Sequence, residues 1–168
     1  NPLRERHMFD LAFFLWSNRQ FEESVAVSGT LIDLLAERPG ASLWVDAMHL
    51  QSMALHDLKR DDEAIETELR SLEFADTLEP ASERAFMHWH LADCYRTTEQ
   101  PDLQEAQYLK AIEAFIESDN KFFLGQAYID LANLHYGARR YEQSKRSFHL
   151  AVPVLEETSR TDRMPFVK

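Results

Sequence analysis

The sequence contains little glycine, proline or cysteine, and each shortage excludes a class of protein. Only 4 Gly and 6 Pro occur in 168 residues, whereas a β-sandwich or barrel needs turn residues about every ten positions, so an all-β fold is close to excluded. One cysteine, Cys94, cannot form an internal disulfide. This fits a reducing compartment, and we predict a cytoplasmic protein. The longest apolar run, Leu11–Trp16, is far shorter than the roughly 20 residues that span a bilayer.

Positive charge is also scarce. Lys and Arg number 18 against 29 Asp and Glu, which gives a net charge of −11. Such a chain repels phosphate backbones and anionic lipid surfaces, so we predict no direct nucleic-acid partner and no membrane partner. Residues 139–168 are the exception, with 7 basic and 4 acidic side chains. A basic end on an acidic body would favour a homodimer through the terminal repeats or an acidic partner, although a solvated helix face is the simpler interpretation.

Catalytic motifs are missing as well. The sequence has no phosphate-binding Gly loop, HExxH or GxSxG, so we predict that the protein is not an enzyme and needs no cofactor. His88, His90 and Cys94 suggest a metal site, because the last two share a helix face at i, i+4. A further ligand would have to come from another repeat, such as His49 or His56. A buried apolar cysteine is the simpler explanation, so no metal site is predicted.

What the sequence does contain is an internal repeat of about 40 residues. Small residues recur at intervals of 40 within the same helical pattern: Ala12, Ser52, Ala92 and Ala132. A second set follows at intervals of 40, 42 and 38: Ser24, Ala64, Ala106 and Ser144. The unequal intervals predict a longer inner turn in the third repeat. We therefore divide the single domain 1–168 into repeats of about 1–40, 41–80, 81–119 and 120–160, with 161–168 starting a further unit or a tail.

Apolar periodicity and turn residues predict eight helices. Their expected bounds are 3–17, 21–37, 42–57, 61–77, 81–97, 103–118, 121–136 and 140–158. Pro39–Gly40 and Glu79–Pro80 separate successive units, and Gly137 suits a left-handed C-cap. Pro153 is expected to kink the last helix or to end it early. A helical bundle with accidental spacing is the alternative to stacked helix pairs.

These features resemble the tetratricopeptide repeat (TPR) family over essentially the whole chain. The best match is the fourth repeat, with Tyr128, Leu131, Ala132, Tyr141, Ser144, Phe148 and Ala151. A unit near 40 residues is similar to the long-repeat variety in bacterial peptide-sensing and signal-transduction regulators. The resemblance implies an all-α fold, a right-handed superhelical α-solenoid of four antiparallel helix pairs. Phe148 and Val152 leave the last helix without a polar outer face, so we expect a fragment of a longer array.

The resemblance also implies a concave groove lined by the first helix of each pair. Three offsets along those helices give twelve candidate contacts with a peptide or partner: Phe9, His49, Trp89 and Ile129; Phe13, Met53, Asp93 and Asn133; Trp16, His56, Arg96 and Tyr136. Asn133 matches the position from which family members often hold a peptide backbone. Such a strip offers apolar pockets and a few polar anchors. The alternative is that half of its aromatic residues belong to the core between repeats.

We predict a module that binds a peptide or protein segment in this groove. Arg96 is the one firmly basic candidate, so a groove that clamps acidic peptide tails is disfavoured, and the partner is expected to be neutral, apolar or basic. The alternative is a ligand-sensing regulatory domain of a larger bacterial transcription or signalling regulator.

Overall fold

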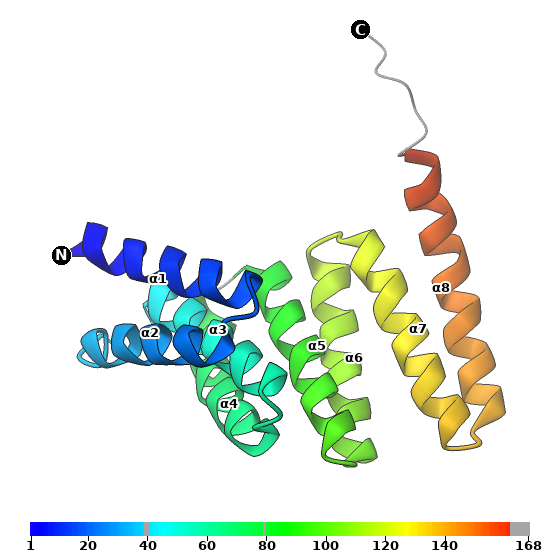
Figure 1. The fold of residues 1–168 in the computed structure, drawn as a ribbon. Helices are drawn as coiled ribbons and strands as arrows, with labels where there is room; N and C mark the ends of the chain where they lie inside the picture. Colours follow the sequence, from blue (N-terminus) through cyan, green and yellow to red (C-terminus); the bar gives the residue numbers. More distant parts are fainter. Residues whose placement is uncertain (39–40, 79, 162–168) are drawn as a thin grey trace, which may run out of the picture. The chain divides into compact units, whose positions relative to one another are not determined.

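The computed structural model describes residues 1–38, 41–78 and 80–161 of the chain. Within these residues all regular structure is helical, in eight helices (Figure 1): α1 (Pro2–Ser17), α2 (Phe21–Leu34), α3 (Ser42–Asp57), α4 (Asp61–Leu78), α5 (Ala81–Thr97), α6 (Pro101–Glu117), α7 (Lys121–Gly137) and α8 (Tyr141–Thr161). The predicted helices are confirmed, with shifts of at most three residues at their ends. The separators Pro39–Gly40, Glu79 and the segment 162–168 lie outside the described residues.

The contacts divide the chain into two compact units. Unit 1 comprises Asn1–Glu79 and Asp93–Glu99, and unit 2 comprises Pro80–Ala92 and Gln100–Lys168. In unit 1, α1 packs on α2, α2 on α3 and α3 on α4, and α1 also touches α3. In unit 2, α7 packs against both α6 and α8. Each unit therefore buries its apolar residues between consecutive helices, as a helical repeat does.

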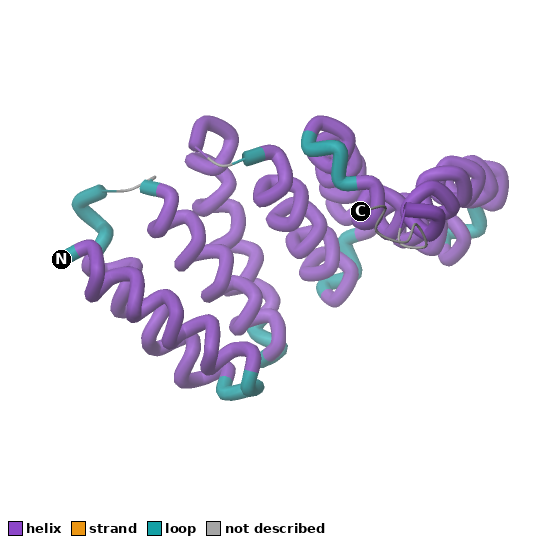
Figure 2. Tube along the Cα trace, turned by 90° about the horizontal axis from the view of Figure 1, so that it is seen from above, coloured by secondary structure: helices purple, strands orange, loops and turns teal. Residues whose placement is uncertain are grey.

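The repeat is regular at 40 residues, including in the third repeat. The second helices begin at residues 21, 61, 101 and 141, and each follows its partner after a three-residue connection (Figure 2). The expected longer inner turn is therefore wrong, because the small residue that suggested it is misassigned. Gln104 is the buried equivalent of Ser24, Ala64 and Ser144, with 6% exposure, whereas Ala106 is exposed.

The short connections share one backbone conformation that requires no glycine. A residue with positive φ recurs at 40-residue intervals: Arg19, Lys59, Glu99 and Arg139. After Arg19, Lys59 and Arg139, the next residue donates its N–H to a carbonyl five positions back, as in Gln20 to Leu15 at 2.9 Å and Arg140 to His135 at 2.8 Å. This is the Schellman arrangement. The predicted left-handed cap at Gly137 is thus wrong, because Gly137 ends α7 and Arg139 takes the left-handed position.

Small residues bring the two helices of a pair together, as predicted. Ala12, Ser52, Ala92 and Ala132 are all 0% exposed. In the first pair the Ser24 hydroxyl donates to the Ala12 carbonyl at 2.9 Å, and in the second the Ser52 hydroxyl donates to the Ala64 carbonyl at 2.8 Å. A bulkier side chain at either crossing would separate the backbones and break this hydrogen bond.

Helix α8 continues past Pro153 to Thr161, so the expected early end is wrong. Its close approach to α7 depends on Gly125, which is buried. A Cβ atom added to Gly125 would lie 2.5 Å from Leu155 Cδ2 and 2.6 Å from Leu155 Cγ. Both distances are well inside van der Waals contact, so an alanine at this position would force the Leu155 side chain to move.

We expect Gly125→Ala to lower the free energy of unfolding by about 1–2 kcal/mol, because overpacking outweighs the gain in helix propensity. Gly137→Ala is the control, since its added Cβ meets nothing within 4 Å. That variant should be neutral or more stable by up to about 1 kcal/mol. Urea unfolding of both variants measures the difference. Recovery of stability in the double variant with Leu155→Ala would locate the clash, and an unchanged Gly125→Ala midpoint would contradict it.

Candidate functional site

In each unit, a tryptophan on the first helix of one pair donates a hydrogen bond to the first helix of the next pair. The Trp16 indole N–H donates to Asp57 Oδ2 at 2.8 Å, which joins α1 to α3 in unit 1. The Trp89 indole N–H donates to Asp130 Oδ2 at 2.9 Å, which joins α5 to α7 in unit 2. Both bonds span 41 residues, slightly more than one repeat. The helices that the sequence assigned to the groove are therefore neighbours within each unit.

The unit 1 part of the predicted strip is aromatic and partly open to solvent. Phe13 is 49% exposed, and its ring centroid lies 5.7 Å from that of the half-buried Trp16. Phe9 is half-buried, and the Arg6 guanidinium lies 5.3 Å from the centre of its ring, a cation–π contact. Met53 is half-buried on α3. Phe13 is therefore the most accessible aromatic side chain of the strip in unit 1.

The two histidines of the strip in unit 1 bond to acidic residues of α4. His49 Nδ1 lies 2.7 Å from Glu68 Oε1, and His56 Nδ1 lies 2.5 Å from Asp61 Oδ1. Burial lowers the pKa of His49, but the charge and hydrogen bond of Glu68 and the charge of Asp46 outweigh it, so the pKa is raised. Sequence reasoning did not identify these partners. The hydrogen bonds to Glu68 and Asp61 fix both histidine rings against α4.

Asp93 and Arg96, which lie in the α5 segment of unit 1, pair with each other. Arg96 Nη2 lies 3.2 Å from Asp93 Oδ1, and the two side chains retain 59% and 38% exposure in the order Arg, Asp. An exposed i, i+3 pair of this kind contributes little stability, so either group can exchange its partner at small cost.

The unit 2 candidates divide between core and surface. Trp89 packs against Phe86, Phe115 and Phe123 in the hydrophobic core, so the core interpretation holds for this residue. Ile129 is half-buried. Asn133 is exposed, and Tyr136, one turn further along α7, is 64% exposed. These two side chains are available to a partner.

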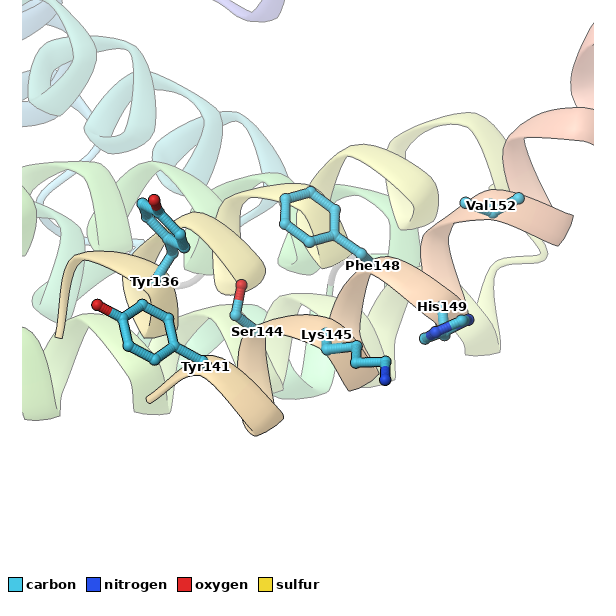
Figure 3. A pocket seen from close by; sticks show the side chains of 7 residues that line it. All are labelled: Tyr136, Tyr141, Ser144, Lys145, Phe148, His149 and Val152. Carbon is cyan, nitrogen blue, oxygen red and sulfur yellow. The ribbon is translucent and has the colours of Figure 1, made fainter. Parts of the chain in front are cut away.

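Tyr136 also lines an open pocket of about 400 Å³ between α7 and α8 (Figure 3). Its ring meets Tyr141 edge to face, with centroids 5.6 Å apart. The other lining residues all belong to α8: Ser144, Lys145, Phe148, His149 and Val152. Sequence reasoning did not assign the α8 residues to a site, because the resemblance placed ligands on first helices. The apolar outer side of α8, noted from Phe148 and Val152, was the available signal.

Comparisons with known proteins identify the fold. No family model matches the sequence, and no curated protein matches it. Among solved structures, the apo form of RapI superposes with a TM-score of 0.84 at 17% identity, covering 93% of this chain and 57% of that one. A Rap protein complexed with Competence and Sporulation Factor gives 0.78 at 17%, covering 92% and 43%. A Podosopora anserina candidate kinesin light chain with nearly identical TPR-like repeats gives 0.71 at 17%, covering 99% and 79%.

The chain therefore has a TPR-like helical repeat fold, and it spans about half the length of the two Rap structures that it matches. At these identities the similarity concerns the fold alone. Within residues 1–38, 41–78 and 80–161, none of the helices combines the length and the hydrophobicity required to cross a bilayer.

Proposed function

We propose that this chain is a binding module that takes up a peptide or protein segment on the exposed faces of its first helices. The observation that carries the proposal is at Tyr136. The repeat register predicts Tyr136 as a binding residue, and Tyr136 lines an open pocket one helical turn from the exposed amide of Asn133. An apolar recess beside a polar anchor is the arrangement that peptide recognition uses.

The chemistry of the pocket favours an apolar side chain as its occupant. Tyr136, Tyr141, Phe148 and Val152 provide apolar surface, and all four are at least 40% exposed in the chain as it stands. Covering such surface with a leucine-sized side chain yields about 1.5–3 kcal/mol. The Asn133 amide both donates and accepts, so it can bind a peptide backbone in either direction. Lys145 at the pocket disfavours a basic residue in this position.

Unit 1 offers a second contact of the same kind. Phe13 presents half of its surface, while the hydrogen bond from Trp16 to Asp57 fixes the neighbouring indole. A rigid aromatic pair loses little entropy when a partner binds, which is why such residues are frequent binding hot spots. The structure of a Rap protein complexed with Competence and Sporulation Factor supports a ligand-binding role for this fold. The alternative, a sensory domain of a larger regulator, receives no additional support from the described residues.

Two matched pairs of variants test the proposal, one in each unit. Random peptides displayed on phage are selected against the chain, and the dissociation constants of selected peptides are measured for every variant. In unit 2, Tyr136→Ala is compared with Leu109→Ala, which removes an exposed apolar side chain from α6. In unit 1, Phe13→Ala is compared with Phe14→Ala, its 59% exposed neighbour on another face of α1.

We expect Tyr136→Ala or Phe13→Ala to weaken binding by about thirtyfold or more, because truncation of a hot-spot aromatic costs about 2 kcal/mol or more. The controls should bind like the unaltered chain, and Asn133→Ala should give a smaller loss than Tyr136→Ala. Peptides that bind all of these variants equally well would show that the first helices do not form the binding surface.

A further inference from the structure

Three chemically different donor groups meet where α3, α4 and α5 lie within unit 1. His56 is the last residue but one of α3, Asp61 is the first residue of α4, and Cys94 lies in α5. One potential ligand atom from each residue lies within 4.8 Å of the other two. The Cys94 side chain is buried, whereas those of His56 and Asp61 keep 18% and 15% exposure. The donor set is therefore mostly enclosed but accessible to a small ion.

We propose that His56, Asp61 and Cys94 form a binding site for a borderline-soft divalent cation, Zn²⁺. Imidazole nitrogen, carboxylate oxygen and thiolate sulfur are the three donor types that zinc takes from proteins. Three protein ligands leave the fourth tetrahedral position to water. This inference is independent of the proposed peptide binding, since Asp61 and Cys94 belong to neither of the surfaces described above.

The geometry requires only a small adjustment. His56 Nδ1 and Asp61 Oδ1 now lie 2.5 Å apart in a hydrogen bond. Zinc bonds of about 2.0–2.2 Å at tetrahedral angles would separate these atoms to roughly 3.3 Å. A rotation of the short Asp61 side chain at the start of α4 supplies that movement. Lys59, in the left-handed conformation, reverses the chain between the two helices and so brings both ligands to one place.

The repeat itself does not require these residues. Equivalent positions one repeat earlier are Trp16, Phe21 and Ala54, and those one repeat later are Arg96, Pro101 and Leu134. Neither of these sets can coordinate zinc, although both belong to repeats with the same helix positions. The fold therefore forms with other residues at these places. The donor set at the junction of the second and third repeats is a local feature with its own function.

The electrostatic surroundings of the sulfur favour a cation. Burial raises the pKa of the Cys94 thiol, and the carboxylates of Glu68, Asp61 and Asp93 raise it further. The same negative potential that opposes a free thiolate attracts a divalent ion. On binding, the S–H bond breaks, the sulfur lone pair forms the S–Zn bond, and the thiol proton passes to solvent. The neutral His56 ring then binds through Nδ1 in the tautomer that carries its proton on Nε2, so the hydrogen bond to Asp61 is replaced without release of a second proton. One thiol proton is thus released for each zinc bound, and the affinity rises with pH.

Cobalt(II) absorption tests the site, because a thiolate bound to Co²⁺ gives a charge-transfer band that oxygen and nitrogen ligands do not. The chain is stripped of metal with a chelator and titrated with Co²⁺, then with Zn²⁺. We expect a charge-transfer band that saturates at one Co²⁺ for each chain and disappears when Zn²⁺ is added. Cys94→Ala should abolish the band, and Asp61→Asn should weaken Co²⁺ binding by at least about tenfold. Asp62→Asn, its exposed neighbour, is the control.

Each result decides the proposal. No band in the unaltered chain, a band that survives Cys94→Ala, or a band that Zn²⁺ does not displace would overturn it. Circular dichroism of the metal-free variants checks their fold. If Cys94→Ala does not fold, Asp61→Asn decides: weaker binding than that of Asp62→Asn supports the site, and equal binding overturns it. Peptide selection on the same samples shows separately whether the proposed binding function holds.

Discussion

Phe115→Ala is expected to lower the free energy of unfolding by about 3–5 kcal/mol, one of the two largest effects for a single substitution in this chain. Phe115 is 0% exposed in unit 2. Its ring centroid lies 5.3 Å from that of Phe86, 6.0 Å from Trp89 and 5.9 Å from Phe123. Removal of the ring leaves a cavity among three other rigid rings, which cannot move inward to fill it.

Ile116→Ala is the matched control, because the neighbouring Ile116 is 56% exposed on the same helix. It should change the stability by no more than about 0.5 kcal/mol. Guanidinium unfolding followed by circular dichroism measures both variants, and a shifted midpoint at constant slope identifies a true change in stability. Similar midpoints for the two variants would mean that the aromatic cluster does not stabilise unit 2.

His49→Ala is expected to have the second large effect, roughly 3 kcal/mol of destabilisation. Glu68 is 0% exposed, and His49 Nδ1 lies 2.7 Å from one of its oxygens. Removing one partner of a buried ion pair leaves a carboxylate without that compensation, which is strongly unfavourable. His88→Ala is a close control. His88 bonds to the Oε1 atom of Gln107 at 2.8 Å over the same separation of 19 residues, but this partner is neutral.

The loss in His88→Ala should therefore be only about 1–2 kcal/mol, the cost of an amide that loses its hydrogen bond. Urea unfolding of both variants at one pH gives the comparison. Equal losses would show that the charge of Glu68 contributes nothing beyond a hydrogen bond.

The His49–Glu68 pair also gives the stability a pH dependence of known sign. The pKa of His49 is raised in the folded chain, whereas that of an unfolded histidine is about 6.5. The folded state therefore binds more protons between these two values. The charged pair contributes fully below about pH 6.5 and loses its contribution as the pH rises through the folded pKa. The stability difference between the unaltered chain and His49→Gln should shrink over that range.

The helix positions could be predicted from the sequence because their signals are local. Apolar spacing and small residues every 40 positions placed eight helices, although α6 begins at Pro101, two residues before its expected start. Two predictions were wrong because they depended only on the type of residue at one position. The small size of Ala106 predicts it at the helix crossing, yet Gln104 occupies the buried position. Gly137 was chosen for its flexibility, yet hydrogen bonds across the turn hold Arg139 in the left-handed conformation.

The candidate site was predictable only in part, for the same reason. The repeat register predicted Phe13, Asn133 and Tyr136 as binding residues. All three side chains are exposed, and a binding surface requires exposed side chains. The register could not show that Trp89 packs against the core, because that depends on Phe115 of α6 and Phe123 of α7. Nor could it show that α8 completes the pocket at Tyr136.

The sequence by itself determined the helices and the small residues of the first helices, because these follow from spacing within a few helical turns. It also determined the 40-residue period, because the same local pattern recurs four times along the chain. The tertiary structure alone decided which polar groups meet. His49 reaches Glu68 across 19 residues, and His56 and Asp61 lie near Cys94 more than 30 residues further along. Such pairings depend on how one helix is rotated and shifted against another, and this is fixed by the packing of many side chains at once.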